Sequence, residues 1–351
     1  MWIFNTHTRT WGCINQKWKN NISCEEERLI RVKNALGYLP TNSIKQVLVK
    51  SKTNIKKISL IVSTGVTVKN YKNTLRKFFN DQFGFCPKII LVHHHLSHIA
   101  SSFYTSGFKE STCLSLDAYG DSASGMIAKA SRKNGIKILE IIDKDNSLGT
   151  LYSAATEFLG YVDGDEYKVM GLASYGKPKV DFSKIIKFKK DFWKIDKSFF
   201  VNQKTPFDHR YSKKFLNEFQ IFKRLSTDKV KQSHKNFAAS IQDLTNKAFA
   251  LSFMRAKKMS PYKKNICFSG GIALNCTSVK EVLSKKIFKN IFIPVNPSDR
   301  GLALGCAYLG SIYKKKIPKV IKSPYLGQSF SNNQILKELK NNNIKIYKPK
   351  N

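Results

Sequence analysis

The chain reads LSLDAYGDSASGMI from residue 114 to residue 127, and this stretch decides the fold. Alternating apolar residues lead to Asp117, a turn follows at Gly120 and Asp121, and a second apolar run begins after it. This order is typical of two antiparallel strands joined by a tight turn. The acid at the end of the first strand belongs either to an ordinary polar turn or to a site that faces an anion.

Strand-like and helix-like runs alternate on both sides of this hairpin, which predicts an α/β fold. The expected strands are 57–63, 88–92, 113–117, 125–130, 136–142, 265–268 and 291–294. The expected helices are 95–103, 148–159, 167–172, 234–258, 272–283 and 302–313, and a capping box from Ser331 to Gln334 predicts one more short helix. A Lys-rich stretch at about 177–235 has no clear period and is interpreted as an insertion.

The composition sets the broad class of the protein. Its 351 residues exceed what one hydrophobic core usually spans, so two lobes are expected. A net charge of +37 would attract polyanions, but only nine of the 61 basic residues are Arg and they are not clustered. We therefore expect no dedicated nucleic-acid surface. The seven Cys show no CxxC and read as reduced thiols, and neither a signal peptide nor a membrane span is visible, so a cytoplasmic protein without a membrane partner is expected.

Four of the seven His lie in the run VHHHLSHI at residues 92–99, between an expected strand and an expected helix. His94 and His98 are spaced i, i+4 and share one helical face, close enough to hold one divalent ion. Two imidazoles do not complete such a site, so a carboxylate from elsewhere is required. The alternative is a structural pair of capping or core histidines.

Two later segments offer turns that suit a ligand. In ICFSGGIALN at 266–275, a strand leads through Gly270 and Gly271 into a helix, so that backbone can approach a ligand closely or simply make a tight turn. In VNPSDRGLALG at 295–305, Asp299 precedes a helix and is either its cap or the missing metal ligand.

Taken together, these segments resemble the carbamoyltransferase family that includes the NodU-type nodulation-factor, cephem and tobramycin O-carbamoyltransferases. The resemblance is carried, in family order, by 25–33 (EEERLIRVK), 94–103, 117–121, 148–153, 167–176 (YKVMGLASYG), 269–275 and 299–305.

The resemblance implies an actin-like ATPase (ASKHA) fold of two ribonuclease-H-like lobes over residues 1–320, related to the tRNA threonylcarbamoyladenosine synthase. Residues 321–351 would begin a linker to a YrdC-like domain that this chain lacks. In the family, the YrdC-like part makes carbamoyl adenylate from carbamoyl phosphate and ATP. The actin-like part, with bound iron, passes the carbamoyl group to a hydroxyl of a sugar or secondary metabolite.

Residue roles follow from the same resemblance. His94, His98 and Asp299 would bind the divalent metal, and His7 would be the catalytic base. The residues around the adenylate would be Asp117, Gly120, Asp121, Lys168, Gly270, Gly271 and Asn275. The chain departs from the family pattern at Thr8-Arg9-Thr10 after His7, at Ala118 in place of Gly, and at Asp121 in place of Glu.

Other functions stay open at this point. A tRNA threonylcarbamoyl transferase would share the metal residues, a truncated non-catalytic remnant would keep only nucleotide or metal binding, and a sugar-kinase-like enzyme would not need the His pair. The partners expected for the first function are a small hydroxyl acceptor and a YrdC-like domain or protein, and a homodimer is left open.

Overall fold

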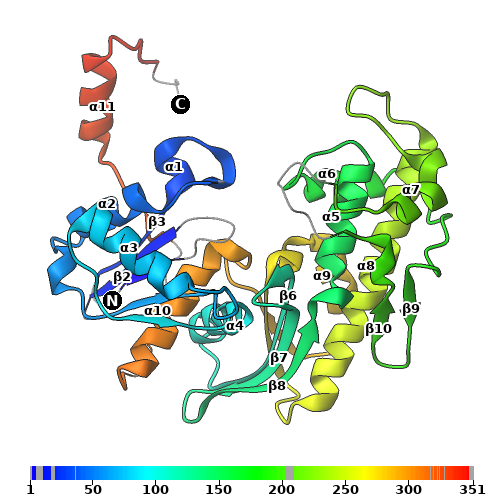
Figure 1. Cartoon of the computed structure of the whole chain (residues 1–351), viewed down its shortest axis with the longest axis horizontal. Helices are drawn as coiled ribbons and strands as arrows, with labels where there is room; N and C mark the ends of the chain where they lie inside the picture. Colours follow the sequence, from blue (N-terminus) through cyan, green and yellow to red (C-terminus); the bar gives the residue numbers. More distant parts are fainter. Residues whose placement is uncertain are drawn as a thin grey trace.

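The computed structural model describes residues 2–4, 11–16, 20–35, 37–201, 209–316 and 329–347, together with 318, 320, 321, 323 and 325–327. His7 lies outside the described residues. The described chain forms two α/β lobes, with the N-terminal sheet in one and the central hairpin in the other (Figure 1).

The first lobe is built on a five-stranded sheet in the order β3-β2-β1-β4-β5. Its strands are β1 (Trp2–Phe4), β2 (Trp11–Gln16), β3 (Asn20–Glu25), β4 (Ile61–Ser63) and β5 (Ile89–Leu91). Strands β1 to β3 are antiparallel, whereas β4 and β5 run parallel to β1. The helices of this lobe are α1 (Glu26–Ile30), α2 (Thr41–Lys50) and α3 (Tyr71–Phe83).

The second lobe repeats that topology. Its sheet has the order β12-β11-β6-β7-β8, with β6 (Glu110–Gly120), β7 (Ala123–Ser131), β8 (Gly135–Asp143), β11 (Asn265–Ser269) and β12 (Asn290–Phe292). Three antiparallel strands are again followed by two parallel ones. Two ribonuclease-H-like sheets in one chain are the actin-like ATPase architecture, so the expected fold is confirmed, although the sequence contains no visible repeat.

Two helices, α4 (His94–Thr105) and α10 (Leu302–Tyr313), fill the space between the sheets (Figure 1). Small side chains of α10, namely Ala303, Cys306 and Ala307, pack on β4 of the first sheet. Helix α4 packs on β6, β7 and β11 of the second sheet. The helices touch where Gly305 faces Ser97, because a Cβ at Gly305 would lie 1.8 Å from the Ser97 carbonyl oxygen. The two lobes are therefore joined through a close helix crossing.

The second lobe also carries a largely helical part, made of α5 (Leu148–Phe158), α6 (Glu166–Ala173), α7 (Lys213–Phe219), α8 (Gln232–Met259) and α9 (Cys276–Ser284). The Lys-rich stretch at 177–235 belongs to it and includes the hairpin β9 (Ile186–Phe188) and β10 (Trp193–Ile195). Its aromatic side chains share one core with α5 and α8: Phe182, Trp193, Phe199, Phe215 and Phe219 pack with Phe158 and Phe237. The described residues of this stretch are thus a packed part of the lobe.

The structure agrees with most of the expected elements. The three strands of the predicted meander are the centres of β6, β7 and β8, and the capping box at Ser331 opens α11 (Asn332–Asn341). Two predictions need correction. The helix expected at 272–283 is a 3-10 turn (Gly271–Leu274) followed by α9, because Asn275 begins a new helix as its N-cap. The strand expected at 57–63 is only β4, because Ile55–Lys57 forms a 3-10 turn. Within the described ranges, no helix has both the length and the apolar character needed to cross a membrane.

Candidate metal centre between the lobes

The His-rich run begins helix α4 directly after strand β5. His93 caps this helix, since its Nδ1 accepts a hydrogen bond from the His95 amide at 3.2 Å. His94 and His98 then face the same way, with ring centroids 4.8 Å apart. His95 points elsewhere and contacts Ser115 Oγ (2.8 Å) and the Ala123 carbonyl (3.1 Å). The run therefore divides into one capping, one core and two inward-facing histidines.

Two carboxylates complete the group. Asp117 ends the straight part of β6, and Asp299 opens the turn before α10. His98 Nε2 lies 3.0 Å from Asp117 Oδ2 and 3.4 Å from Asp299 Oδ1, and His94 Nε2 lies 3.8 and 3.4 Å from the same two oxygens. The two histidine Nε2 atoms are 3.1 Å apart. One ligand atom from each of the four residues thus lies within 4.8 Å of the other three.

This donor set fits a divalent metal ion. An ion with four to six ligands at about 2.0–2.2 Å separates neighbouring donor atoms by roughly 2.8–3.6 Å. Four of the five separations, from 3.0 to 3.4 Å, fall in that range, and the fifth, 3.8 Å between His94 Nε2 and Asp117 Oδ2, is slightly longer. Two imidazole nitrogens and two carboxylate oxygens suit iron, zinc or manganese. Both histidines are buried, and the side chains of Asp117 and Asp299 are only 15% and 13% exposed, so the centre is largely shielded from water.

The electrostatics of the cluster follow from this packing. Burial by itself lowers the pKa of His94, but Asp299 and Asp117 outweigh burial and raise it to about 10. Burial and Asp299 would raise the pKa of Asp117, yet its contacts with His94 and His98 lower it to about 2. The two carboxylates therefore favour positive charge at this place, in keeping with a site for a cation. Burial keeps the pKa of His95 well below its ordinary value, in keeping with a neutral core residue.

Glycines allow the surrounding backbone to approach these ligands. A Cβ at Gly120 would lie 2.2 Å from His94 Cγ, and one at Gly271 would lie 2.9 Å from Asp117 Oδ1. Gly270 has a φ of +95°, and a Cβ there would lie 2.0 Å from the Leu116 carbonyl oxygen. The Gly-Gly turn after β11 therefore packs directly on the end of β6.

The residues expected around the adenylate have different positions. Asp117 belongs to the metal cluster, and Gly120, Gly270 and Gly271 pack around it or its neighbours. Lys168 instead pairs with Asp165 at 2.9 Å. Their role in binding adenylate stays a prediction.

Asn275 lies in a polar network of the helical part. Its Oδ1 accepts from the Ser278 amide (3.0 Å) and from Gln242 Nε2 (3.1 Å), so it caps α9. Its Nδ2 donates to Gln242 Oε1 at 3.1 Å. Asn275 therefore has a structural role in the described chain, in addition to any contact with a ligand.

Sequence reasoning did not find two ion pairs that the 25–33 segment makes. Arg300, next to Asp299, pairs with Glu27 of α1 at 3.0 Å. Lys33 Nζ lies 3.9 Å from Asp165 Oδ1, so this pair links the first lobe to the helical part of the second. The charged residues clustered between Glu25 and Lys33 single out this segment in the sequence. Their spacing cannot indicate ion-pair partners that lie more than 100 residues away.

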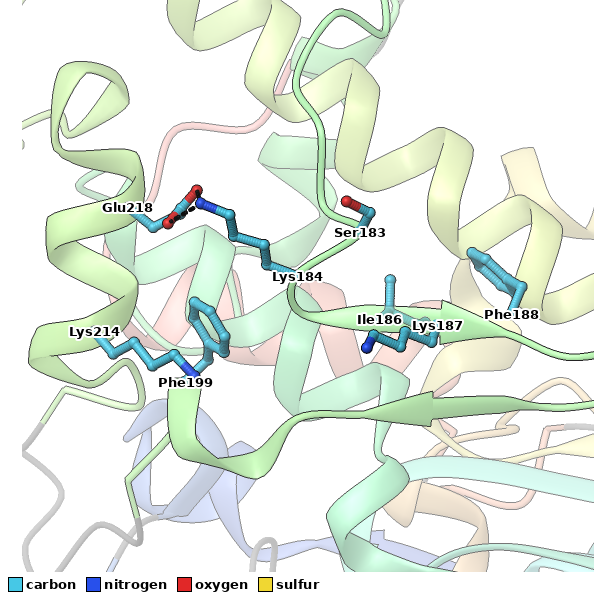
Figure 2. A pocket seen from close by; sticks show the side chains of 8 residues that line it. All are labelled: Ser183, Lys184, Ile186, Lys187, Phe188, Phe199, Lys214 and Glu218. Atoms are coloured by element: carbon cyan, nitrogen blue, oxygen red, sulfur yellow. Dashed lines mark hydrogen bonds and ion pairs between the residues drawn. The ribbon is translucent and has the colours of Figure 1, made fainter.

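A separate open pocket of about 960 Å³ lies in the helical part (Figure 2). It is lined by residues of β9, α7 and their connections, and Figure 2 shows Lys184 reaching Glu218, at 2.7 and 3.0 Å from its two oxygens. Lys214, on the same rim, pairs with Asp196. The pocket shares no residue with the metal cluster.

Comparison with known proteins finds relatives along most of the chain. The chain is 32% identical over 295 residues to protein sll1178 of Synechocystis sp. and 30% identical over 331 residues to nodulation protein NolNO of Sinorhizobium fredii. These alignments cover 80% and 86% of this chain but 47% of each relative, so the chain spans about half their length. Among solved structures, HypF of T. kodakarensis has a TM-score of 0.49 at 14% identity, over 90% of this chain and 48% of that one.

The family described as carbamoyltransferase N-terminus matches residues 41–308. That range includes His94, His98, Asp117 and Asp299, the four side chains of the cluster. With the match extending over most of the chain, the protein belongs to the carbamoyltransferase N-terminus family.

Proposed function

We propose that the chain is the acceptor half of an O-carbamoyltransferase, which passes a carbamoyl group from carbamoyl adenylate to a hydroxyl of a sugar or secondary-metabolite acceptor. The observation that carries the proposal is the buried His94, His98, Asp117 and Asp299 cluster, within a chain of the carbamoyltransferase family. Family membership supports carbamoyl transfer, and the cluster supports a metal-assisted form of it.

In the proposed reaction, the acceptor oxygen forms a bond to the carbamoyl carbon. The bond from that carbon to the adenylate phosphate oxygen breaks, and AMP leaves with the electron pair. The acceptor proton passes to a base, for which His7 remains the sequence-based candidate. A divalent ion, with iron expected, would supply Lewis acidity when bound. His94, His98, Asp117 and Asp299 would hold this ion, and the burial of the cluster excludes competing water.

The adenylate is proposed to lie against the Gly270-Gly271 turn and the β6–β7 hairpin. The Gly270-Gly271 turn brings backbone close to Asp117, and the hairpin brings Gly120 onto the His94 ring, so both turns lie against the metal cluster. Carbamoyl phosphate and ATP would be converted to the adenylate by a YrdC-like domain or protein. The relatives are about twice as long as the aligned part, which leaves room in them for such a second activity.

Metal content gives the first test. Elemental analysis of the purified chain is expected to show about one divalent ion per molecule, and His98→Ala is expected to lose it. His209→Ala is the matched control, because His209 is exposed and stacks on Tyr211 in the helical part. Equal metal content in wild type and His98→Ala would contradict the proposed centre.

Activity gives the second test. The chain is mixed with a YrdC-like protein, carbamoyl phosphate, ATP and a panel of sugar and aminoglycoside acceptors, and carbamoylated product is sought by mass spectrometry. Product is expected only when the YrdC-like protein is present. Product from the chain alone would show that it makes its own adenylate, and no product despite bound metal would favour a non-catalytic remnant.

A further inference from the structure

The tip of the β6–β7 hairpin is a two-residue turn in which neither residue is glycine. Gly120 and Ala123 face each other, and the two residues between them have left-handed backbone, with φ of +50° at Asp121 and +63° at Ser122. A two-residue turn with both φ values positive follows the twist of the strands, and Asp tolerates this conformation better than most residues. The turn therefore fixes the direction in which the Asp121 side chain points away from the hairpin.

The Asp121 carboxylate joins three separate segments. Oδ2 accepts from the amides of His94 (2.8 Å) and Gly65 (3.1 Å), and Oδ1 accepts from the amide (3.1 Å) and hydroxyl (3.2 Å) of Thr67. Gly65 and Thr67 lie in the loop after β4 of the first lobe, and His94 begins α4. A single charged group from the second lobe therefore holds a loop of the first lobe and the helix that carries both metal histidines.

The residue before Asp121, Gly120, contacts the side chain of the candidate metal ligand His94. Without a side chain, Gly120 lies directly on the His94 ring, as the 2.2 Å from its notional Cβ to Cγ shows. His94 is thus held at two points: its ring by Gly120 and its backbone amide by Asp121. Hydrogen bonds from amides to a carboxylate are among the stronger ones, and they gain from the positive end of a helix.

We propose that Asp121 is a positioning residue of the metal centre, which fixes His94 through its backbone amide, and that it is not a ligand of the nucleotide. The inference rests on the proposed metal site. It also revises the sequence-based expectation that Asp121 faces the adenylate, because the two carboxylate oxygens already accept four hydrogen bonds from the protein.

The test uses Co²⁺ as the probe, since its visible spectrum reports the geometry of its ligands. Asp121→Asn replaces one carboxylate oxygen by an NH₂ group that cannot accept from the facing amides. Loss of a group that orients a metal ligand typically weakens metal affinity about 10–100-fold. We expect a weakening in this range, with a changed Co²⁺ spectrum and little change in ATP affinity.

Two further variants act as controls. Asp181→Asn removes a carboxylate that likewise accepts from an amide and a hydroxyl, both of Ser183, but in the helical part, and should leave Co²⁺ binding unchanged. Thr67→Val removes a single bond and keeps the one to His94, so its effect should be small.

The outcomes separate the possibilities. Unchanged Co²⁺ affinity and spectrum in a folded Asp121→Asn would overturn the inference. Loss of ATP binding with Co²⁺ binding intact would restore the nucleotide role. Wild type that binds no Co²⁺ would remove the metal site itself. Should Asp121→Asn fail to fold, Asp121→Ser takes its place with the same expectation. If neither folds while Asp181→Asn does, Asp121 serves the fold and not the metal centre, and the inference fails.

Discussion

Replacing Gly120 with Ala is expected to remove metal binding while leaving the fold in place. The added methyl group would lie 2.2 Å from His94 Cγ, 2.4 Å from Cδ2 and 2.5 Å from Nδ1, whereas ordinary contacts begin at 3.4 Å. Either the ring or the hairpin must therefore move by about 1.2 Å, the difference between 3.4 and 2.2 Å. Metal sites tolerate deviations of only ~0.2 Å in ligand distances, so a shift of this size is too large for a ligand. The variant should lose the His94 ligand.

Two effects are then expected at once. Divalent-metal affinity should fall by more than the roughly 100-fold that loss of a supporting group causes, because a ligand itself is displaced. The free energy of unfolding of the metal-free chain should fall by about 1–3 kcal/mol, the usual cost of overpacking. Isothermal titration with Co²⁺ or Mn²⁺ measures the first effect, and urea unfolding with a chelator present measures the second.

The matched control is Gly171→Ala in α6. It is the same substitution, but apart from its own helix backbone and its chain neighbours nothing lies within 4 Å of the new methyl group. Stability should therefore stay or rise slightly, and metal binding should not change. Wild-type metal affinity in Gly120→Ala would refute the reasoning, because it would mean that His94 is not needed for the ion or is not where the structure places it.

Three further results are expected. A double-mutant cycle with Glu27→Gln and Arg300→Met should give a coupling of roughly 0.5–1 kcal/mol in thermal unfolding, since the pair is partly exposed, and zero coupling would show that the ion pair is absent in solution. Burial and the charges of Arg224 and Lys231 lower the pKa of His234 below 6.5, so the stability it contributes is complete above that pH and is lost as pH falls through its folded pKa. This loss should be smaller in His234→Gln, which keeps an acceptor for the Lys231 amide. The urea midpoint, measured between pH 7 and 5, would contradict the prediction if it fell equally in the variant and in wild type. Phe158→Ala should cost about 3–5 kcal/mol in chemical unfolding because the ring is fully buried, and a loss below 1 kcal/mol would argue against the shared aromatic core.

The structure also changes what one obvious experiment can show. Gly271→Val would be chosen from the sequence to block a nucleotide cleft. In the structure, its Cβ would lie 2.9 Å from Asp117 Oδ1, so the variant would disturb a candidate metal ligand as well. Nucleotide binding by this variant therefore has to be measured together with metal binding.

Periodic segments were predictable from the sequence, and irregular ones were not. The meander and the long helix α8 have strong local patterns, and their centres were predicted correctly. Helix α3 was missed although Leu75, Phe78 and Phe79 have helical spacing and are buried, so its signal was present. The 177–235 stretch had a weaker signal, because its aromatic residues lie in short strands, single turns and the short helix α7, none of which is long enough to show a clear period.

The candidate site shows the same limit. The i, i+4 spacing of His94 and His98 predicts a shared face because both belong to one helix. Asp117 could be assigned to a strand end but not to a metal or a phosphate, since that choice depends on where the turn at Asp299 lies in space. The contacts of Asp121 with Gly65 and His94 are likewise long-range. Local chemistry can therefore name the two histidine ligands of this centre, but neither the role of Asp117 nor the groups that hold the ligands in place.

The crossing of α4 and α10 has a consequence for how the protein assembles. Asp299 follows His94 by 205 residues and Asp117 lies between them, so no short fragment contains the whole centre. An ion that binds only the complete arrangement stabilises that arrangement by mass action, by about 2.7 kcal/mol at a hundredfold excess over its dissociation constant. Loading with metal would thus act as a late check on folding: a chain whose two sheets have not closed on the helix pair would gain nothing from the ion and would remain open to proteolysis.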